Sequence, residues 1–86
     1  MDYRVIIKKS AIKELSKIPR LDATRISAAI DGFIQNPYPK GYKKLKGAAN
    51  EYRIRVGDYR ILYSIFEDVL VVEVIKIGHR QNVYKR

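Results

Sequence analysis

The sequence predicts an α+β domain in which an N-terminal strand and a helical hairpin pack on one face of an antiparallel sheet. Two observations lead to this prediction. In the first half of the chain, apolar residues recur at helical spacing. After residue 50 the pattern changes to the alternation that is typical of β-strands. Because the chain has 86 residues and no linker or repeat, residues 1–86 are expected to form a single domain.

The first strand and the first helix follow from the opening residues. Residues 3–7 are predicted to form a short strand, which we expect to be the fourth strand of the antiparallel sheet. Ser10 is the predicted N-cap of the helix that follows. Pro19 ends this helix, because the residue before a proline avoids helical backbone angles. The apolar face of the helix carries Ile12, Leu15 and Ile18.

A second helix is expected after this proline, with Asp22 or Thr24 as its N-cap. Its apolar residues occur at i, i+4, i+7 and i+8, which places them on one side of a helix. They are Ile26, Ile30, Phe33 and Ile34. The sequence Asn-Pro-Tyr-Pro at 36–39 ends the helix, and the two helices form a hairpin.

Three strands are predicted in the second half of the chain, after a basic loop at 40–50. Their ranges are 51–56, 59–66 and 69–77. The turns between them, Gly57-Asp58 and Glu67-Asp68, each have two residues and therefore indicate tight antiparallel hairpins. Gly78 is expected to end the last strand, and a polar tail follows it.

Two-residue turns also predict which residues face each other. Arg55 lies opposite Arg60 in the first hairpin, and Arg60 lies opposite Ile75 in the second. One face of the sheet is apolar and is expected to be covered by the helices. The opposite face is predicted to carry Arg53, Arg55, Arg60 and Glu73, together with the apolar residues Leu62, Ile75 and Ile77.

Composition narrows the class of protein. The absence of cysteine excludes a disulfide framework, a zinc knuckle and a thiol nucleophile. The apolar run at the N-terminus is too short for a signal peptide, and no stretch approaches the ~20 apolar residues of a membrane span. We therefore expect a cytoplasmic protein. With 18 basic and 9 acidic residues, the net charge of +9 indicates a polyanionic partner: nucleic acid, an anionic membrane surface or an acidic protein.

The arginines of the predicted outer face suggest a phosphate-binding site. Like charges directly opposite in a sheet, as predicted for Arg55 and Arg60, are destabilising by up to about 1 kcal/mol. A local cost without an evident structural gain often marks a functional site. Guanidinium groups match the geometry of phosphate oxygens. The alternative is that these arginines are ordinary solvated residues, partly neutralised by Glu73.

The loop and the tail add candidates for RNA binding. Basic residues there would contact phosphates, and an interleaved tyrosine would stack on an unpaired base. The candidates are Lys40, Tyr42, Lys43, Lys44, Lys46, Lys85 and Arg86. Tyr38 is a further possible stacking platform. The alternative for each tyrosine alone is a core or rim aromatic.

Three segments, taken together and in this order, resemble the RelE/ParE toxins of type II toxin–antitoxin systems. They are KLKG at 44–47, YRIRVGDYRILY at 52–63, and IGHR at 77–80 with VY at 83–84. The resemblance covers nearly the whole chain. It implies an endoribonuclease that enters the ribosomal A site and cuts mRNA, and thereby inhibits translation. It also implies a separate antitoxin as partner, which we expect to be acidic and similar to RelB. No membrane partner is expected.

The resemblance also assigns roles to individual residues. Positions that act on the reaction in RelE-type toxins match Arg53, Arg55, Arg60, Arg80 and Tyr84. The best-known RelE members carry lysines where this chain carries Arg53 and Arg55. Arginine stays protonated, so these two residues can stabilise charge but cannot serve as the general base.

The sequence shows no cluster of metal ligands, so we expect neither a metal nor a cofactor. The expected reaction is attack of the ribose 2′-OH on its own phosphate. Arg55, Arg60 and Arg80 would stabilise the charge that develops on phosphorus. His79, the sole histidine, and Tyr84 are the first candidates for proton transfer, and Glu73 and a lysine such as Lys46 are the others. The alternatives are a solvated or capping role for His79 and base stacking for Tyr84.

Two other functions remain open at this point. One is a ParE-like toxin with the same fold that acts on DNA gyrase. The other is an RNA- or ribosome-binding module without catalysis. The set of four arginines and one tyrosine matched above favours the ribonuclease over both.

Overall fold

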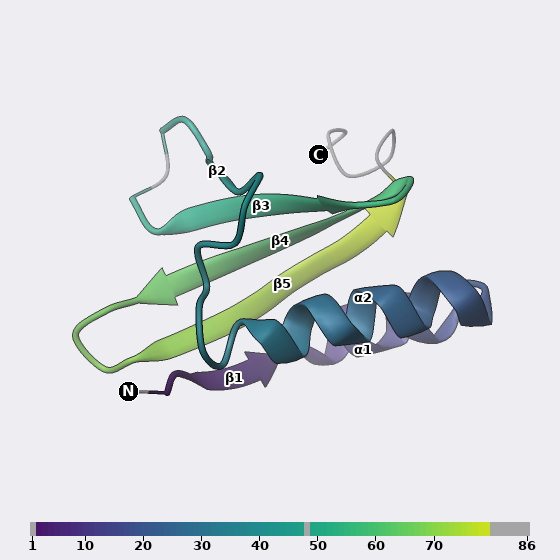
Figure 1. Cartoon of the computed structure of the whole chain (residues 1–86), viewed down its shortest axis with the longest axis horizontal. Helices are drawn as coiled ribbons and strands as arrows, with labels where there is room; N and C mark the ends of the chain where they lie inside the picture. Colours follow the sequence, from purple (N-terminus) through teal and green to yellow (C-terminus); the bar gives the residue numbers. More distant parts are fainter. Residues whose placement is uncertain (1, 48, 80–86) are drawn as a thin grey trace.

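Two helices cover one face of a five-stranded sheet in the computed structural model, which describes residues 2–47 and 49–79 (Figure 1). The helices are α1 (Lys9–Ser16) and α2 (Arg20–Gly32). The strands are β1 (Arg4–Ile7), β2 (Lys43–Lys44), β3 (Glu51–Val56), β4 (Tyr59–Phe66) and β5 (Val71–His79). The predicted α+β class, with the helical hairpin on one face of the sheet, is confirmed.

The sheet has the strand order β1-β5-β4-β3-β2. β2, β3, β4 and β5 pair antiparallel, whereas β1 runs parallel to β5. The expectation of a purely antiparallel sheet is therefore wrong for its first strand. An alternating pattern shows which side of a short strand is buried, but it does not specify the direction of the strand. The two-residue strand β2 lies within the segment that was expected to be a loop.

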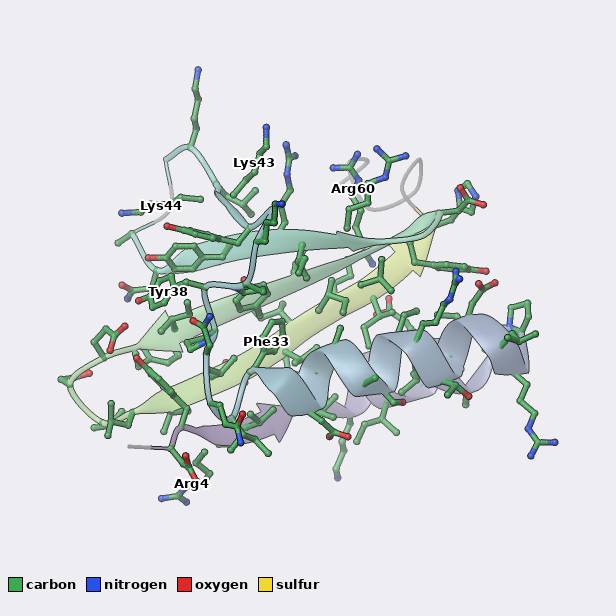
Figure 2. All side chains as sticks on the ribbon, viewed as in Figure 1. Arg4, Phe33, Tyr38, Lys43, Lys44 and Arg60 are labelled. Carbon is green, nitrogen blue, oxygen red and sulfur yellow. The ribbon has the colours of Figure 1, made fainter. Side chains whose placement is uncertain are left out.

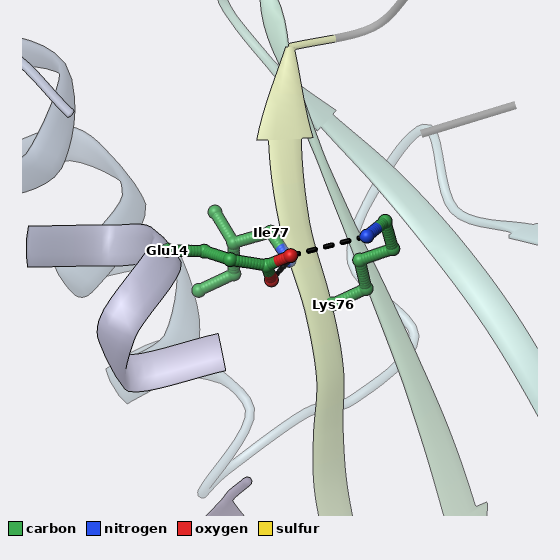
Figure 3. A network of polar contacts seen from close by, with 3 residues as sticks. All are labelled: Glu14, Lys76 and Ile77. Carbon is green, nitrogen blue, oxygen red and sulfur yellow. Dashed lines mark hydrogen bonds and ion pairs between the residues drawn. The ribbon is translucent and has the colours of Figure 1, made fainter. Parts of the chain in front are cut away.

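A side chain of α1 protects the edge of β5 that β1 leaves uncovered. β1 pairs with β5 only as far as Val74. Beyond Val74, the carboxylate of Glu14 accepts a hydrogen bond from the backbone N–H of Ile77 at 2.9 Å. It also forms an ion pair with Nζ of Lys76 at 3.1 Å (Figure 3). An open strand edge exposes unpaired backbone groups, and this carboxylate satisfies one backbone donor of the edge.

Both helices begin earlier than predicted. The N-caps are Lys8 and Pro19, and neither makes a side-chain capping hydrogen bond. Ser10 lies within α1, and Asp22 and Thr24 lie within α2, so the predicted caps are wrong. The two cap residues have extended backbone angles, which any residue or a proline can adopt. Asp22 stabilises the first turn of α2 through the helix dipole instead.

The first hairpin has the predicted register, and the second does not. Gly57, with φ of +60°, allows the two-residue turn that places Arg55 opposite Arg60. The second turn spans 67–70, because Phe66 pairs with Val71. A two-residue type I′ turn needs positive φ at both central residues, and in this turn only Leu70 adopts it, at +54°.

An irregularity in β5 changes which of its residues face the helices. Leu62 pairs with Lys76 and Tyr63 pairs with Val74, so Ile75 is an extra residue of the β-bulge type. As a result Ile77 pairs with Ile61 and is 1% exposed. Its predicted position on the outer face is wrong. Arg60 lies opposite Gly78 rather than Ile75 because the turn is two residues longer than predicted and β5 contains this one extra residue.

The core lies between the helices and the inner face of the sheet, and Phe33 lies between α2 and the strands (Figure 2). Its largest fully buried side chains include Tyr63, Phe33, Ile26, Ile61 and Ile77. Tyr63 donates a hydrogen bond to the carbonyl of Pro37 at 2.9 Å, which satisfies its buried hydroxyl. Within residues 2–47 and 49–79, no helix is long and apolar enough to cross a membrane.

Candidate nucleic-acid interface

Four basic side chains surround a hollow on the face of the sheet opposite the helices. Its volume is about 210 Å³, and its lining residues are Gly41, Lys43, Arg53, Arg55 and Arg60. We call it the arginine hollow. Figure 2 shows Lys43 and Arg60 projecting from this side of the sheet, away from the helices. The predicted arginine face therefore exists as a concave surface.

Strand pairing determines the positions of these side chains. Alternation along β3 sends Arg53 and Arg55 to the same side of the sheet. Pairing then adds one residue from each neighbouring strand, since Lys43 of β2 lies opposite Arg53 and Arg60 of β4 lies opposite Arg55. Four cations from three strands thus converge on one hollow.

Local contacts restrain two of the arginines. Arg55 donates from Nε to the carbonyl of Gly57 at 3.3 Å, which directs its guanidinium along the turn. Arg60 is only partly exposed, and its Nε is buried. On the β5 side it faces Gly78, which has no side chain to compete for the space. Restrained guanidinium groups are suited to binding phosphate oxygens in a fixed geometry.

The charge of the hollow is not offset by the carboxylate that was expected to do so. Glu73 pairs with Ser64, four residues along β4 from Arg60, a separation of about 13 Å at 3.3 Å per residue. It does not line the hollow, and none of the described residues that line it is acidic. The arrangement can bind a phosphate group and stabilise additional negative charge on it.

The structure places His79 away from this hollow. His79 is the last residue of β5 and pairs with Tyr59, and the two ring centroids are 5.7 Å apart. Tyr59 packs against the core from the helix-facing side of the sheet. Because paired residues share a face, His79 lies on that side and not on the arginine side.

Among the predicted RNA-binding lysines that the structure describes, Lys43 is the one that lines the arginine hollow. Lys44 pairs with Tyr52 and so lies on the other side of β2. Lys40 and Lys46 are exposed outside the hollow. Gly41 is a lining residue that the sequence reasoning missed. The signal was a glycine within a basic loop, and its φ of +91° is one that other residues rarely adopt.

Tyr42 belongs to a cluster of aromatic rings at the edge of the sheet. Its ring centroid is 5.4 Å from that of Tyr38 and 6.0 Å from that of Tyr52. Tyr52 in turn stacks on the buried Tyr63. Tyr42 is nevertheless 41% exposed, so one part of its ring is accessible to a base. The remaining candidates, Arg80, Tyr84, Lys85 and Arg86, lie outside the described residues.

A carboxylate bound by two tyrosines anchors the segment that leads into the hollow. Glu67, in the turn after β4, accepts a hydrogen bond from Tyr3 at 2.8 Å and another from Tyr38. These bonds, that of Tyr38 first, lower the pKa of Glu67. They raise the pKa of both tyrosines. We call this group the tyrosine clasp (Tyr3, Tyr38 and Glu67).

Known proteins match this chain in both sequence and structure. Residues 5–84 match the model of the family described as the ParE toxin of type II toxin–antitoxin systems, parDE. The chain belongs to the RelE/ParE family of type II toxins. The putative toxin RelE1 of Methanocaldococcus jannaschii is 32% identical, over 99% of this chain and 98% of its own length. Toxin RelG of Mycobacterium tuberculosis is 29% identical over the full length of both.

Solved structures of RelE proteins have the same architecture as this toxin. The RelE–RelB complex from Pyrococcus horikoshii OT3 matches with a TM-score of 0.83 and 33% identity, covering 93% of this chain and 97% of that one. The RelB–RelE antitoxin–toxin complex from Methanococcus jannaschii matches with a TM-score of 0.77 and 28% identity, covering 93% and 95%. The family membership and the RelE-like fold predicted from the sequence are both confirmed.

Proposed function

We propose that this RelE/ParE-family toxin is a ribosome-dependent mRNA endoribonuclease whose arginine hollow holds the scissile phosphate. The observation that carries the proposal is the convergence of Lys43, Arg53, Arg55 and Arg60 on one hollow, with Arg55 directly opposite Arg60. A pair of like charges in this position disfavours the folded sheet, and a bound phosphate would offset that repulsion.

In the proposed reaction the 2′-oxygen of a ribose forms a bond to the adjacent phosphorus, and the bond from phosphorus to the 5′-oxygen breaks. The products are a 2′,3′-cyclic phosphate and a free 5′-hydroxyl. Arg53, Arg55 and Arg60, with Arg80, stabilise the negative charge of the pentacoordinate phosphorus. A base removes the 2′-OH proton, and an acid returns a proton to the leaving 5′-oxygen.

We assign a proton-transfer role to Tyr84 in preference to His79. Arginine stays protonated near neutral pH, so the residues of the hollow leave this role to another group. His79 pairs with Tyr59 on the helix-facing side, which counts against its reaching the phosphate. The nucleotides that flank the scissile bond are proposed to contact the basic loop and tail through Lys40, Tyr42, Lys43, Lys44, Lys46, Lys85 and Arg86.

In cells whose growth is not inhibited, the proposed partner of the toxin is an acidic antitoxin that covers the arginine hollow. Two of the solved relatives of this toxin are complexes of RelE with RelB. A chain with net charge +9 attracts an acidic partner, and complementary charge speeds the encounter. With mRNA and the ribosome as its targets, the proposed place of action is the cytoplasm.

Primer extension on mRNA after induced expression tests this function. We expect cuts in frame with translation, and no cuts from Arg60→Ala expressed to the same level. A second candidate follows from the ParE description of the matched family, namely poisoning of DNA gyrase. DNA damage without mRNA cuts would support that candidate and contradict the ribonuclease. Growth inhibition with neither effect would support a binding module.

A further inference from the structure

α1 lies on the face of the sheet that is opposite the arginine hollow (Figure 1), and it carries a second basic surface. Lys9, Lys13 and Lys17 are exposed and follow one another at intervals of four residues along α1 and its C-cap. At 100° and 1.5 Å per residue, they fall within an arc of about 80° and are spaced about 6 Å apart along the axis. We call these three residues the lysine stripe.

Helix stability explains only part of this arrangement, because the helix dipole favours a cation at Lys13 in the last turn and at Lys17, the C-cap, but not at Lys9. Like charges at i and i+4 destabilise a helix, and the stripe contains two such pairs. Lys9 is also in the first turn of α1, where the helix dipole disfavours a cation and where no acidic residue is present. Glu14, the acidic residue of α1, is engaged by Lys76 and by the backbone of Ile77. The stripe thus carries a local cost that a ligand of opposite charge would offset.

The surroundings of the stripe favour a polyanion. Residues 8–21 contain five basic residues and one acidic residue. Lys8 and Arg20, at the N-terminal boundaries of α1 and α2, are exposed and extend the positive charge along the helical hairpin. A basic patch of this kind on one face is typical of binding to a phosphate backbone.

We propose that the lysine stripe binds the phosphate backbone of double-stranded RNA. The segment 8–21 has no aromatic residue, so it offers no platform on which unpaired bases could stack. Proteins bind RNA duplexes through phosphate and 2′-hydroxyl contacts, without stacking. Lysines on a convex helix, each a flexible point charge, suit a continuous backbone better than a single phosphate.

The same helix lacks what a membrane-surface helix requires. Such a helix inserts a continuous apolar face into the lipid boundary. The apolar face of α1 packs against the sheet instead, with Ala11 fully buried and Leu15 packed against the core, as is Ile18 just after the helix. The exposed apolar residues Ile12 and Leu21 are separated by nine positions and do not make such a face.

The proposal adds a second contact to the proposed function, because it places the toxin between an mRNA strand at the hollow and duplex RNA at the stripe. Its test reads binding and not cleavage. A toxin that failed to bind duplex RNA would therefore contradict this proposal but not the proposed cleavage of mRNA. Absence of mRNA cleavage would in turn leave the duplex-binding result standing.

The test compares two double variants of the full chain that have the same net charge. Lys9→Gln with Lys13→Gln removes two charges of the stripe. Arg4→Gln with Arg25→Gln removes two exposed charges from β1 and α2, outside the stripe and the hollow. Each pair lowers the formal charge from +9 by two. Circular dichroism checks that both variants retain the fold.

Binding to a blunt RNA duplex of about 16 base pairs is measured between about 50 and 200 mM salt. The logarithm of the binding constant falls as the logarithm of the salt concentration rises. We expect the stripe variant to reduce the magnitude of this slope by about 2, one for each lost phosphate contact. The control variant should reduce it by less than half as much. Equal losses from both variants would overturn the proposal, because total charge would then explain the binding. So would an unchanged slope for the stripe variant. Loss of binding to phosphatidylserine vesicles or to polyglutamate, with duplex binding retained, would also overturn it.

Discussion

The two basic surfaces of this toxin differ in residue type, shape and restraint. The arginine hollow is concave and built on three strands, and the guanidinium of Arg55 is held by the turn that follows it. The lysine stripe is convex, and its side chains extend from α1 into solvent. Planar guanidinium groups on a rigid sheet suit one phosphate in a defined position. Ammonium groups on a helix suit a series of phosphates whose positions are less fixed. The two proposals therefore assign chemistry to the concave surface and attachment to the convex one.

The largest expected change in cleavage rate concerns proton transfer at the hollow, which the lysine stripe does not share. Tyr84→Phe is expected to slow mRNA cleavage by roughly 10²–10⁴-fold, which is typical of losing a general acid or base. Because His79 lies on the helix-facing side opposite Tyr59, His79→Ala should cleave close to the parent rate. Single-turnover cleavage on programmed ribosomes measures both. A slow His79→Ala beside a normal Tyr84→Phe would reverse the two assignments.

Exchanging lysine and arginine tests whether geometry matters at each surface. Arg60→Lys keeps the charge of the hollow but loses the planar fork, so cleavage should fall roughly tenfold, the equivalent of one charge-assisted hydrogen bond. Lys13→Arg keeps the charge of the stripe, where no fixed geometry is needed, and duplex binding should be unchanged. Cleavage rate and duplex affinity are measured for both variants. An Arg60→Lys variant as fast as the parent would show that charge alone suffices at the hollow.

Both surfaces are expected to reduce the stability of the free toxin. Arg55→Thr removes the repulsion with Arg60, and Lys13→Gln removes two repulsions along α1. Each should raise the free energy of unfolding by a few tenths of a kcal/mol, up to about 1. Urea denaturation at low salt gives the values, and the gain should shrink as added salt screens the charges. A stability loss in both variants would contradict the view that these charges are retained for function.

The smallest effect concerns the tyrosine clasp, which has no counterpart at the lysine stripe. Hydrogen bonds from Tyr38 and Tyr3 lower the pKa of Glu67 below its ordinary value of 4.5. The clasp therefore stabilises the fold above that pH, and this contribution is lost as pH falls through the lowered pKa. Glu67→Gln should lower the melting temperature slightly near neutral pH, and the difference should vanish in acid. A difference that stays constant from neutral to acidic pH would rule out titration of the clasp.

Much of the arginine hollow could be predicted from the sequence, because a glycine fixes the register of its hairpin. A two-residue turn starting with Gly57 permits only one pairing, and that pairing places Arg55 opposite Arg60. Alternation then sends Arg53 to the same side. Gly41 and Lys43 join the hollow only through the short strand β2, whose two residues are too few to produce a periodic pattern.

The second hairpin could not be predicted in the same way. Its turn contains a leucine at positive φ, and β5 contains an extra residue near Ile75, and neither feature follows from apolar alternation. The extra residue reverses the facing of everything after it. Ile77 therefore enters the core, and His79 moves to the side of Tyr59. A single inserted residue thus places the sole histidine on the face of the sheet opposite the arginines.

Single-turnover cleavage of mRNA on programmed ribosomes, at saturating toxin, tests the central claim most directly. Arg60→Ala removes one charge-stabilising group from the hollow and should slow cleavage by about 10²–10³-fold. Lys9→Gln with Lys13→Gln should require more protein to saturate the ribosomes but should then cleave at the parent rate. If Arg60→Ala also cleaved at the parent rate, the arginine hollow would not be the site that holds the scissile phosphate.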